Sequence, residues 1–242
     1  MIDLHCHIIP HLDDGAYDAR VACQMAHHML RCGVKTVVAT PHSNLMGSRT
    51  GFLGSRYRQS FGLFCALLRQ AHIPLQVLPG SELLADPCNL TRLLENRLPI
   101  PLNGTDYLLV EFSFTAPGAE ISAMLRDIRS AGYRPVIAHP ERYRAVQSDL
   151  LWAERWFERG YLLQVNKGSL LDRLGAASCE ASHRLLARGM VDVIASDAHD
   201  MRMRPPGFQS LLPILRRLCT PEYVRLLLDE NPARILDNRT VR

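Results

Sequence analysis

The chain has 242 residues, of which 47% are hydrophobic and 21% charged, and its formal net charge is +4 at neutral pH. This length and composition predict one folded domain, 1–242, and exclude a disordered or low-complexity chain. The mild charge, spread along the chain, predicts no nucleic-acid binding, and the absence of a long apolar stretch or a signal-peptide pattern predicts a cytoplasmic protein without membrane insertion.

The first seven residues predict a strand that leads into a metal site. Asp3, His5 and His7 alternate with Leu4 and Cys6, and side chains on a strand point alternately to its two faces. We therefore expect Asp3 and both histidines on one face, and Leu4 and Cys6 on the other. Neutral imidazole is a common ligand of transition metals, which gives a reason for polar side chains at this position.

Short apolar runs and helical stretches alternate through the rest of the chain, which is typical of repeated βα units. After a helix at 18–31, further strands are expected at 36–39, 75–78, 107–110, 135–138, 162–165 and 191–195. Helices are expected at 55–71, 120–131, 150–159 and 178–188, followed by two or three more after Phe208. The nearly continuous hydrophobicity of the runs indicates parallel strands covered on both faces. Seven such strands predict a closed or nearly closed α/β barrel, with a doubly wound open sheet as the alternative.

Most of these strands end in a residue that can bind a metal ion. In parallel α/β folds the C-terminal strand ends lie at one edge, so we expect these residues to form one ring. With one aspartate from the first loop, the candidates are His5, His7, Asp14, His42, Glu82, Glu111, His139, Asp197 and His199. Each alone is explained by a structural role, but the whole set indicates a metal centre. Nitrogen and oxygen ligands suit two or three ions of Mn²⁺, Fe²⁺ or Zn²⁺, and hydrolysis by metal-activated hydroxide.

One further pattern points to a different mechanism. Cys219 and Arg225 stand six residues apart, as in the bare Cys-x₅-Arg pattern of cysteine-dependent tyrosine phosphatases. The residues between them include no glycine, and Pro221 lacks an N–H group that a phosphate-binding loop would need. We therefore expect an ordinary helix start with Thr220 as its N-cap, and no nucleophilic role for Cys219.

Several motifs of the chain occur together in one known superfamily. They are Asp3-x-His5-x-His7, Asp13-Asp14-Gly15, Thr40-Pro41-His42, Glu82, Glu111, His139-Pro140-Glu141-Arg142-Tyr143, Gln164-Val165-Asn166 and Ser196-Asp197-Ala198-His199. This set resembles the PHP (polymerase and histidinol phosphatase) superfamily. Within it the chain is most similar, over essentially its whole length, to the bacterial metal-dependent tyrosine phosphatases of capsule and exopolysaccharide loci.

The resemblance implies a distorted seven-stranded (β/α) barrel with its active site at the C-terminal ends of the strands. It also implies a trinuclear centre that prefers manganese, built from the same nine ligands, with Arg142 and Arg204 holding the phosphate. The implied substrate is a phosphotyrosine-containing protein, a bacterial tyrosine autokinase that controls polysaccharide export. The oligomeric state is left open. Two positions depart from the family pattern, because many relatives have a histidine in place of Ser43 and a glycine in place of His11.

Three other functions remain open from the residues alone. A small-molecule phosphoesterase such as a histidinol-phosphate phosphatase would use a similar metal cluster on the same type of barrel. A barrel that has lost activity is disfavoured because all nine ligands are present, and a nucleic-acid-directed domain is disfavoured by the lack of a basic stripe. The loop at 43–54, which follows His42, is expected to overhang the site.

Overall fold

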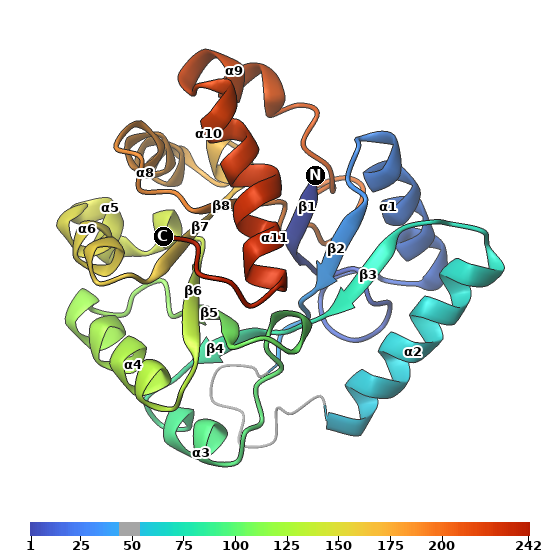
Figure 1. The fold of residues 1–242 in the computed structure, drawn as a ribbon, viewed down its shortest axis with the longest axis horizontal. Helices are drawn as coiled ribbons and strands as arrows, with labels where there is room; N and C mark the ends of the chain where they lie inside the picture. Colours follow the sequence, from blue (N-terminus) through green and yellow to red (C-terminus); the bar gives the residue numbers. More distant parts are fainter. Residues whose placement is uncertain (44–53) are drawn as a thin grey trace.

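The computed structural model describes residues 1–43 and 54–242, so the loop that was expected to overhang the site lies, except for its two ends, outside the described residues. Figure 1 shows the strands at the centre of the molecule with the helices around them. The strands are β1 (Ile2–Cys6), β2 (Thr36–Ala39), β3 (Gln76–Pro79), β4 (Glu82–Ala85), β5 (Tyr107–Phe112), β6 (Arg134–Ala138), β7 (Leu162–Asn166) and β8 (Val193–Ala195).

The helices expected from the sequence are present, and three short helices among the described residues are additional. The helices are α1 (Ala19–Arg31), α2 (Gly54–Gln70), α3 (Leu90–Glu95), α4 (Gly118–Ser130), α5 (Arg144–Ser148), α6 (Leu151–Glu158), α7 (Lys167–Leu170), α8 (Ala176–Ala187), α9 (Leu212–Leu218), α10 (Pro221–Arg225) and α11 (Asn231–Leu236). The additional ones are α3, α5 and α7. Helix α1 begins after Asp18, whose carboxylate accepts the N–H of Val21 at 2.7 Å as an N-cap. Across residues 1–43 and 54–242, no helix combines the length and apolarity needed to cross a bilayer.

All the paired strands are parallel and form two sheets, ordered β1-β2-β3 and β4-β5-β6-β7-β8. The sheets meet at two seams, where single bridges join Cys6 to Ala198 and His42 to Glu82. The predicted α/β class with parallel strands is confirmed. The architecture differs from the prediction in having eight strands in two sheets, with no closed ladder of strands among the described residues.

The eighth strand arises at a break that the sequence pattern did not reveal. All seven predicted strands are present within a few residues of their expected positions, and β4 is additional. Between β3 and β4 the N–H of Gly80 donates to the hydroxyl of Tyr57 at 3.0 Å, so it takes no part in a strand ladder. β3 then pairs with β2, whereas β4 pairs with β5. Glu82 therefore begins a strand of its own, at the seam between the sheets.

The alternation expected at the start of the chain is wrong for Leu4 and Cys6. Leu4 packs with Val38 and Leu109 in one hydrophobic cluster, whereas Cys6 belongs to a separate and larger cluster. The reason is an irregularity in the pairing register of β1 between Asp3 and Cys6. Such a bulge shifts the alternation of side chains between the two faces of a strand.

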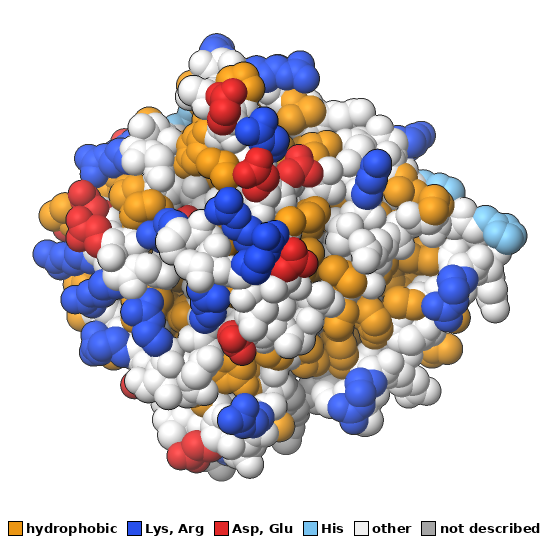
Figure 2. All heavy atoms as spheres, in the orientation of Figure 1, with side chains coloured by type: hydrophobic (Ala, Val, Ile, Leu, Met, Phe, Trp, Pro, Cys, Tyr) orange, Lys and Arg blue, Asp and Glu red, His pale blue; other side chains and the backbone are white. Residues whose placement is uncertain are grey.

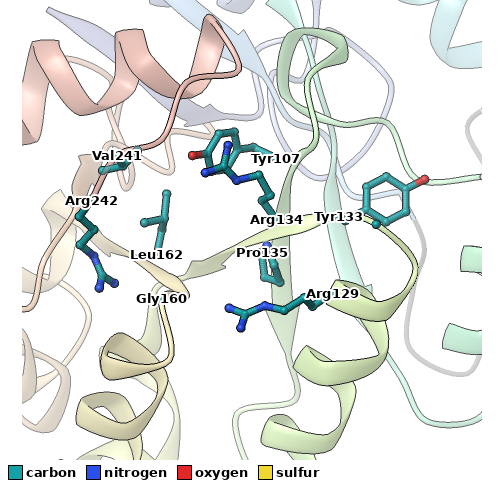
Figure 3. A pocket seen from close by; sticks show the side chains of 10 residues that line it. Tyr107, Arg129, Tyr133, Arg134, Pro135, Gly160, Leu162, Val241 and Arg242 are labelled. Carbon is teal, nitrogen blue, oxygen red and sulfur yellow. The ribbon is translucent and has the colours of Figure 1, made fainter.

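The opposite end of the strands carries a basic hollow that is separate from the predicted site. Its volume is about 400 Å³, and Arg129, Arg134 and Arg242 lie around it, beside the first residues of β5, β6 and β7 (Figure 3). Arg242 is neutralised there by the buried Asp192, with Nε 2.7 Å from Oδ1. Figure 2 shows the basic side chains of this face interspersed with acidic and apolar ones. The face therefore presents no continuous basic stripe.

Candidate metal centre

The nine predicted ligands come together at one end of the molecule's strands, around Glu82, which begins β4 at the seam between the sheets. Its two carboxylate oxygens lie 3.3 Å from Nε2 of His5 and 3.4 Å from Nε2 of His7. They also lie 3.1 Å from Nδ1 of His42 and 3.0 Å from Nε2 of His139. The predicted clustering is thereby confirmed for these five residues, which come from β1, β4 and the loops after β1, β2 and β6.

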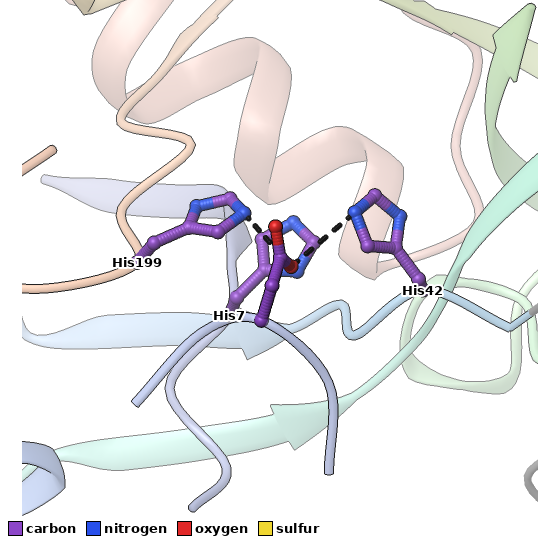
Figure 4. Close-up of side chains that lie close together, drawn as sticks. His7, His42 and His199 are labelled. Atoms are coloured by element: carbon purple, nitrogen blue, oxygen red, sulfur yellow. Dashed lines mark ion pairs between the residues drawn. The ribbon is translucent and has the colours of Figure 1, made fainter. Parts of the chain in front are cut away.

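The other four candidates surround this group. Asp14 Oδ1 lies 3.4 Å from Nε2 of His199 and 3.5 Å from Nε2 of His42. Figure 4 shows these two imidazoles on either side of His7, with a dashed line for each ion pair. Asp197 Oδ1 lies 3.5 Å from Nδ1 of His199, and Glu111 Oε2 lies 3.9 Å from Nδ1 of His42. In three groups of side chains, the atoms that could bind a metal ion lie within 4.8 Å of one another. The groups are His7 with Asp14, His42 and His199; His5 with His7 and Glu82; and His42 with Glu82 and Glu111.

The orientation of the first two histidines fits a bound cation. Nδ1 of His5 lies 2.8 Å from Oε1 of Gln164, and Nδ1 of His7 lies 2.6 Å from Oδ2 of Asp13. Because both oxygens are acceptors, Nδ1 of each ring carries the proton and Nε2 of the neutral ring carries a lone pair. The two Nε2 atoms face each other at 3.2 Å. Two lone pairs so close repel unless a positive charge lies between them, and a metal ion would supply it.

The charges of the cluster also call for a cation. Burial disfavours the protonated form of His5, but the carboxylates of Glu82 and Asp197 outweigh this effect and raise its pKa to about 9. Burial, together with the negative charge of Glu82, raises the pKa of Glu111 to about 8. Without metal, protons therefore balance the carboxylates at neutral pH. Metal binding would displace these protons.

Two of the candidates stand in backbone conformations that non-glycine residues rarely adopt. His139 has φ of 33° and Asp197 has φ of 48°, each at a cost of about 1–3 kcal/mol. The surrounding hydrogen bonds hold Asp197 in place, because its N–H donates to the carbonyl of His5 at 2.9 Å and its Oδ2 accepts from Nδ2 of Asn166 at 2.7 Å. These bends turn both side chains toward the cluster at the ends of their strands.

Gly15 allows the first loop to approach the cluster. A Cβ atom at this position would lie 2.1 Å from the carbonyl oxygen of His7. The N–H of the next residue, Ala16, donates to that same oxygen at 2.9 Å. A side chain at position 15 would therefore push the loop away and displace Asp13 and Asp14 with it.

Three polar residues of the site were given no role from the sequence. Asp13 orients His7, whereas Gln164 orients His5 and donates through Nε2 to Oδ1 of Asn166 at 2.8 Å. Such partners of metal-binding imidazoles fix the ring orientation and raise its basicity. The sequence did hold one signal for Gln164. It lies in a strand expected to be buried, where a side-chain amide needs a hydrogen-bond partner.

The two arginines expected to hold phosphate lie beside the cluster and face one carboxylate oxygen. Asp197 Oδ2 lies 3.3 Å from Nη1 of Arg204 and 3.8 Å from Nη1 of Arg142. The side chains are 29% and 23% exposed, so solvent and ligands can reach both guanidinium groups. The buried Lys167 fixes the loop of Arg204 by donating through Nζ to the carbonyl oxygens of Pro205 and Gly207.

The two departures from the family pattern have different surroundings. His11 has a left-handed backbone with φ of 60°, which explains why glycine suits this position. Its carbonyl accepts Nη2 of Arg56 at 2.9 Å, and its ring packs against Tyr17. The N–H of Ser43 donates to the carbonyl of Glu82 at 2.9 Å, so Ser43 contributes to the seam between the sheets.

The Cys-x₅-Arg segment is a helix start, as predicted. Oγ1 of Thr220 accepts the N–H of Tyr223 at 3.3 Å as the N-cap of α10. Burial raises the pKa of the Cys219 thiol, which opposes formation of a nucleophilic thiolate.

We expect replacement of Cys219 by serine to leave kcat/KM for a phosphomonoester within about twofold of the unchanged protein, because burial disfavours the thiolate and the residues after Cys219 begin an ordinary helix. Steady-state kinetics on the metal-loaded variant are the measurement. A folded, metal-loaded and inactive Cys219→Ser protein would instead require covalent catalysis through this thiol.

The chain is similar over its whole length to known proteins. A family model for capsular polysaccharide synthesis, CpsB/CapC, matches residues 1–237. The tyrosine-protein phosphatase YwqE of Bacillus subtilis is 34% identical over 241 residues, covering 100% of this chain and 93% of the relative. A solved structure from work on YwqE and on CpsB from Streptococcus pneumoniae, described as unique metal-dependent tyrosine phosphatases, matches with a TM-score of 0.89 and 32% identity over 100% of this chain and 96% of that one.

A more distant structure shares the fold alone. An organophosphorus hydrolase variant from Deinococcus radiodurans has a TM-score of 0.63 at 16% identity, over 97% of this chain and 92% of that one.

The resemblance to tyrosine phosphatases of capsule loci, expected from the sequence motifs, is confirmed by the family model and by the full-length relatives. The chain belongs to the CpsB/CapC family of capsular polysaccharide synthesis proteins.

Proposed function

We propose that this chain is a metal-dependent phosphotyrosine-protein phosphatase, with 1–242 as a single catalytic domain of the PHP type. The observation that carries the proposal is the meeting of two solvent-accessible arginines with a buried histidine and carboxylate cluster at one end of the strands. Full-length relatives named tyrosine-protein phosphatases support the same activity. If β3 and β4 are counted as one interrupted strand, the two sheets joined at their seams would form the wall of a distorted seven-stranded barrel.

The proposed metal ligands are the nine clustered residues, His5, His7, Asp14, His42, Glu82, Glu111, His139, Asp197 and His199. The three groups of donor atoms suit two or three divalent ions, with Mn²⁺ the expected metal and Fe²⁺ or Zn²⁺ as alternatives. When bound, such ions lower the pKa of nearby water and offset negative charge on a phosphoryl group. Asp13 and Gln164 would orient the imidazoles of His7 and His5 toward the ions. Arg142 and Arg204 would hold the phosphate.

The proposed substrate is a phosphotyrosine-containing protein, a bacterial tyrosine autokinase that controls capsule or exopolysaccharide synthesis. The match to the capsular polysaccharide synthesis family supports this role. A site open enough for two arginines to remain accessible suits a phosphorylated side chain on a protein surface.

The proposal predicts a preference among three substrates. The metal-loaded protein should hydrolyse a phosphotyrosine peptide with kcat/KM at least roughly tenfold above that for the matched phosphoserine peptide and for histidinol phosphate, the scale on which pocket contacts discriminate substrates. Comparing the three kcat/KM values at one metal concentration is the test. Faster turnover of histidinol phosphate would replace the proposal by a small-molecule phosphatase.

A further inference from the structure

An exposed aromatic side chain, Phe114, lies beside the candidate metal centre. Phe112, Phe114 and Tyr143 all lie at this end of β5 and β6, but Phe112 and Tyr143 are fully buried. The hydroxyl of Tyr143 donates to the carbonyl of Ala138 at 2.6 Å, which keeps it in the core. Phe114 is 36% exposed, so of these three rings it alone can contact a bound molecule.

Phe114 is held against the residues of the proposed phosphate site. The guanidinium carbon of Arg142 lies 4.3 Å from the centroid of its ring, and the ring of His139 approaches it edge-on with centroids 5.8 Å apart. The carbonyl of Phe114 accepts the N–H of Arg144 at 2.8 Å, which ties the turn after β5 to the segment of Arg142. The exposed ring is therefore fixed next to a guanidinium group and a proposed metal ligand.

We propose that Phe114 forms the binding subsite for the aromatic ring of phosphotyrosine, an inference that rests on the proposed function. In phosphotyrosine one ester oxygen separates the ring from phosphorus. A phosphate group that is hydrogen-bonded to Arg142 therefore brings the ring of the phosphotyrosine within a few ångströms of that guanidinium group. Phe114, in contact with the same group, lies within reach of the substrate ring. Offset or edge-to-face packing of two such rings is favourable beyond the area that it buries.

The subsite would contribute to discrimination between phosphate esters. The side chain of phosphoserine carries no ring to pack against Phe114, whereas its phosphate can still reach Arg142. Loss of the ring contact should therefore weaken binding of phosphotyrosine and leave binding of the phosphate group itself unchanged. A role for Phe114 in merely holding Arg142 would instead alter every phosphate ligand.

The test compares Phe114→Leu and Phe114→Tyr with the unchanged, metal-loaded protein. For Phe114→Leu we expect KM for a phosphotyrosine peptide to rise about 3- to 10-fold, the scale of one aromatic pair. The inhibition constant of inorganic phosphate, and kcat/KM for the phosphoserine peptide, should stay within about twofold. Phe114→Tyr keeps the ring and should restore KM. Tyr133→Leu, which changes a partly exposed ring before β6 at the other end of the strands, is the matched control and should have no effect.

Two results would overturn the subsite, and they are distinct from failure of the proposed function. An unchanged KM for the phosphotyrosine peptide in Phe114→Leu would exclude the ring contact. A parallel rise in KM and in the phosphate inhibition constant would assign Phe114 to holding Arg142. Failure of the unchanged protein to hydrolyse phosphotyrosine would refute the proposed function, and the subsite with it.

Discussion

Replacing Glu82 by glutamine should remove metal from the protein and lower kcat/KM by about 10³-fold or more, because a metal ion contributes several kcal/mol of charge stabilisation to such a reaction. The two oxygens of Glu82 face four imidazoles at 3.0 to 3.4 Å. Glutamine has nearly the same shape but no charge, and one of its terminal atoms donates hydrogen bonds instead of accepting them. Elemental analysis and steady-state kinetics on the purified variant measure both effects.

The matched control is Glu180→Gln, which removes an exposed carboxylate that pairs with Arg184 on α8 at 3.7 Å. Metal content and activity should not change, since an exposed pair of this kind contributes little. Prolonged chelation of the unchanged protein should abolish activity, and added Mn²⁺ should restore it. A Glu82→Gln protein with full metal content and normal kcat/KM would mean that the centre is not built around Glu82.

Replacing Arg142 or Arg204 by alanine should lower kcat/KM about 10²-fold, the effect of losing one preorganised charge-stabilising donor. Metal content should remain normal, because neither residue belongs to the nine proposed ligands. Both guanidinium groups face Asp197 Oδ2 and so point toward one place beside the cluster. A guanidinium group can donate hydrogen bonds to two phosphate oxygens at once, which orients the phosphorus and offsets the negative charge of the phosphate.

Lysine at either position should restore activity only in part, since it keeps the charge but lacks the forked geometry. Arg202→Ala is the control, because Arg202 is an exposed arginine on the same loop as Arg204. It should retain normal kcat/KM. If Arg142→Ala and Arg204→Ala both keep full metal content and normal activity, the phosphate must be held by other groups.

The sequence predicted where the ligands would meet because parallel βα units bring their strand ends to one edge. His42 and Asp197 are 155 residues apart along the chain, with His139 between them, yet each of the three follows an apolar strand of the same kind. The repeated strand and helix pattern is local, and the clustering of strand ends follows from it without any knowledge of side-chain packing. Local sequence also predicted the helix start at Thr220, which argues against a phosphate-binding loop after Cys219.

Tertiary structure decided what depends on contacts between distant segments. The break at Gly80, the register irregularity in β1 and the division into two sheets follow from backbone pairing, which apolar runs do not encode. The hydrogen-bond partners of His5 and His7 were likewise not predicted from the sequence. Gln164 is remote from His5 in sequence, and Asp13 can bond to His7 only because Gly15 lets the first loop approach His7.

The exposure of three aromatic residues near the site was also decided by packing and not by the sequence pattern. The sequence places Phe112, Phe114 and Tyr143 shortly after the predicted strands at 107–110 and 135–138 but says nothing of their exposure. Packing buries Phe112 and Tyr143 and leaves Phe114 beside Arg142. Periodicity and strand-end residues thus predicted which candidate ligands meet and where, because both are properties of local segments. Accessibility and orientation were decided by long-range packing, because they depend on which segments become neighbours.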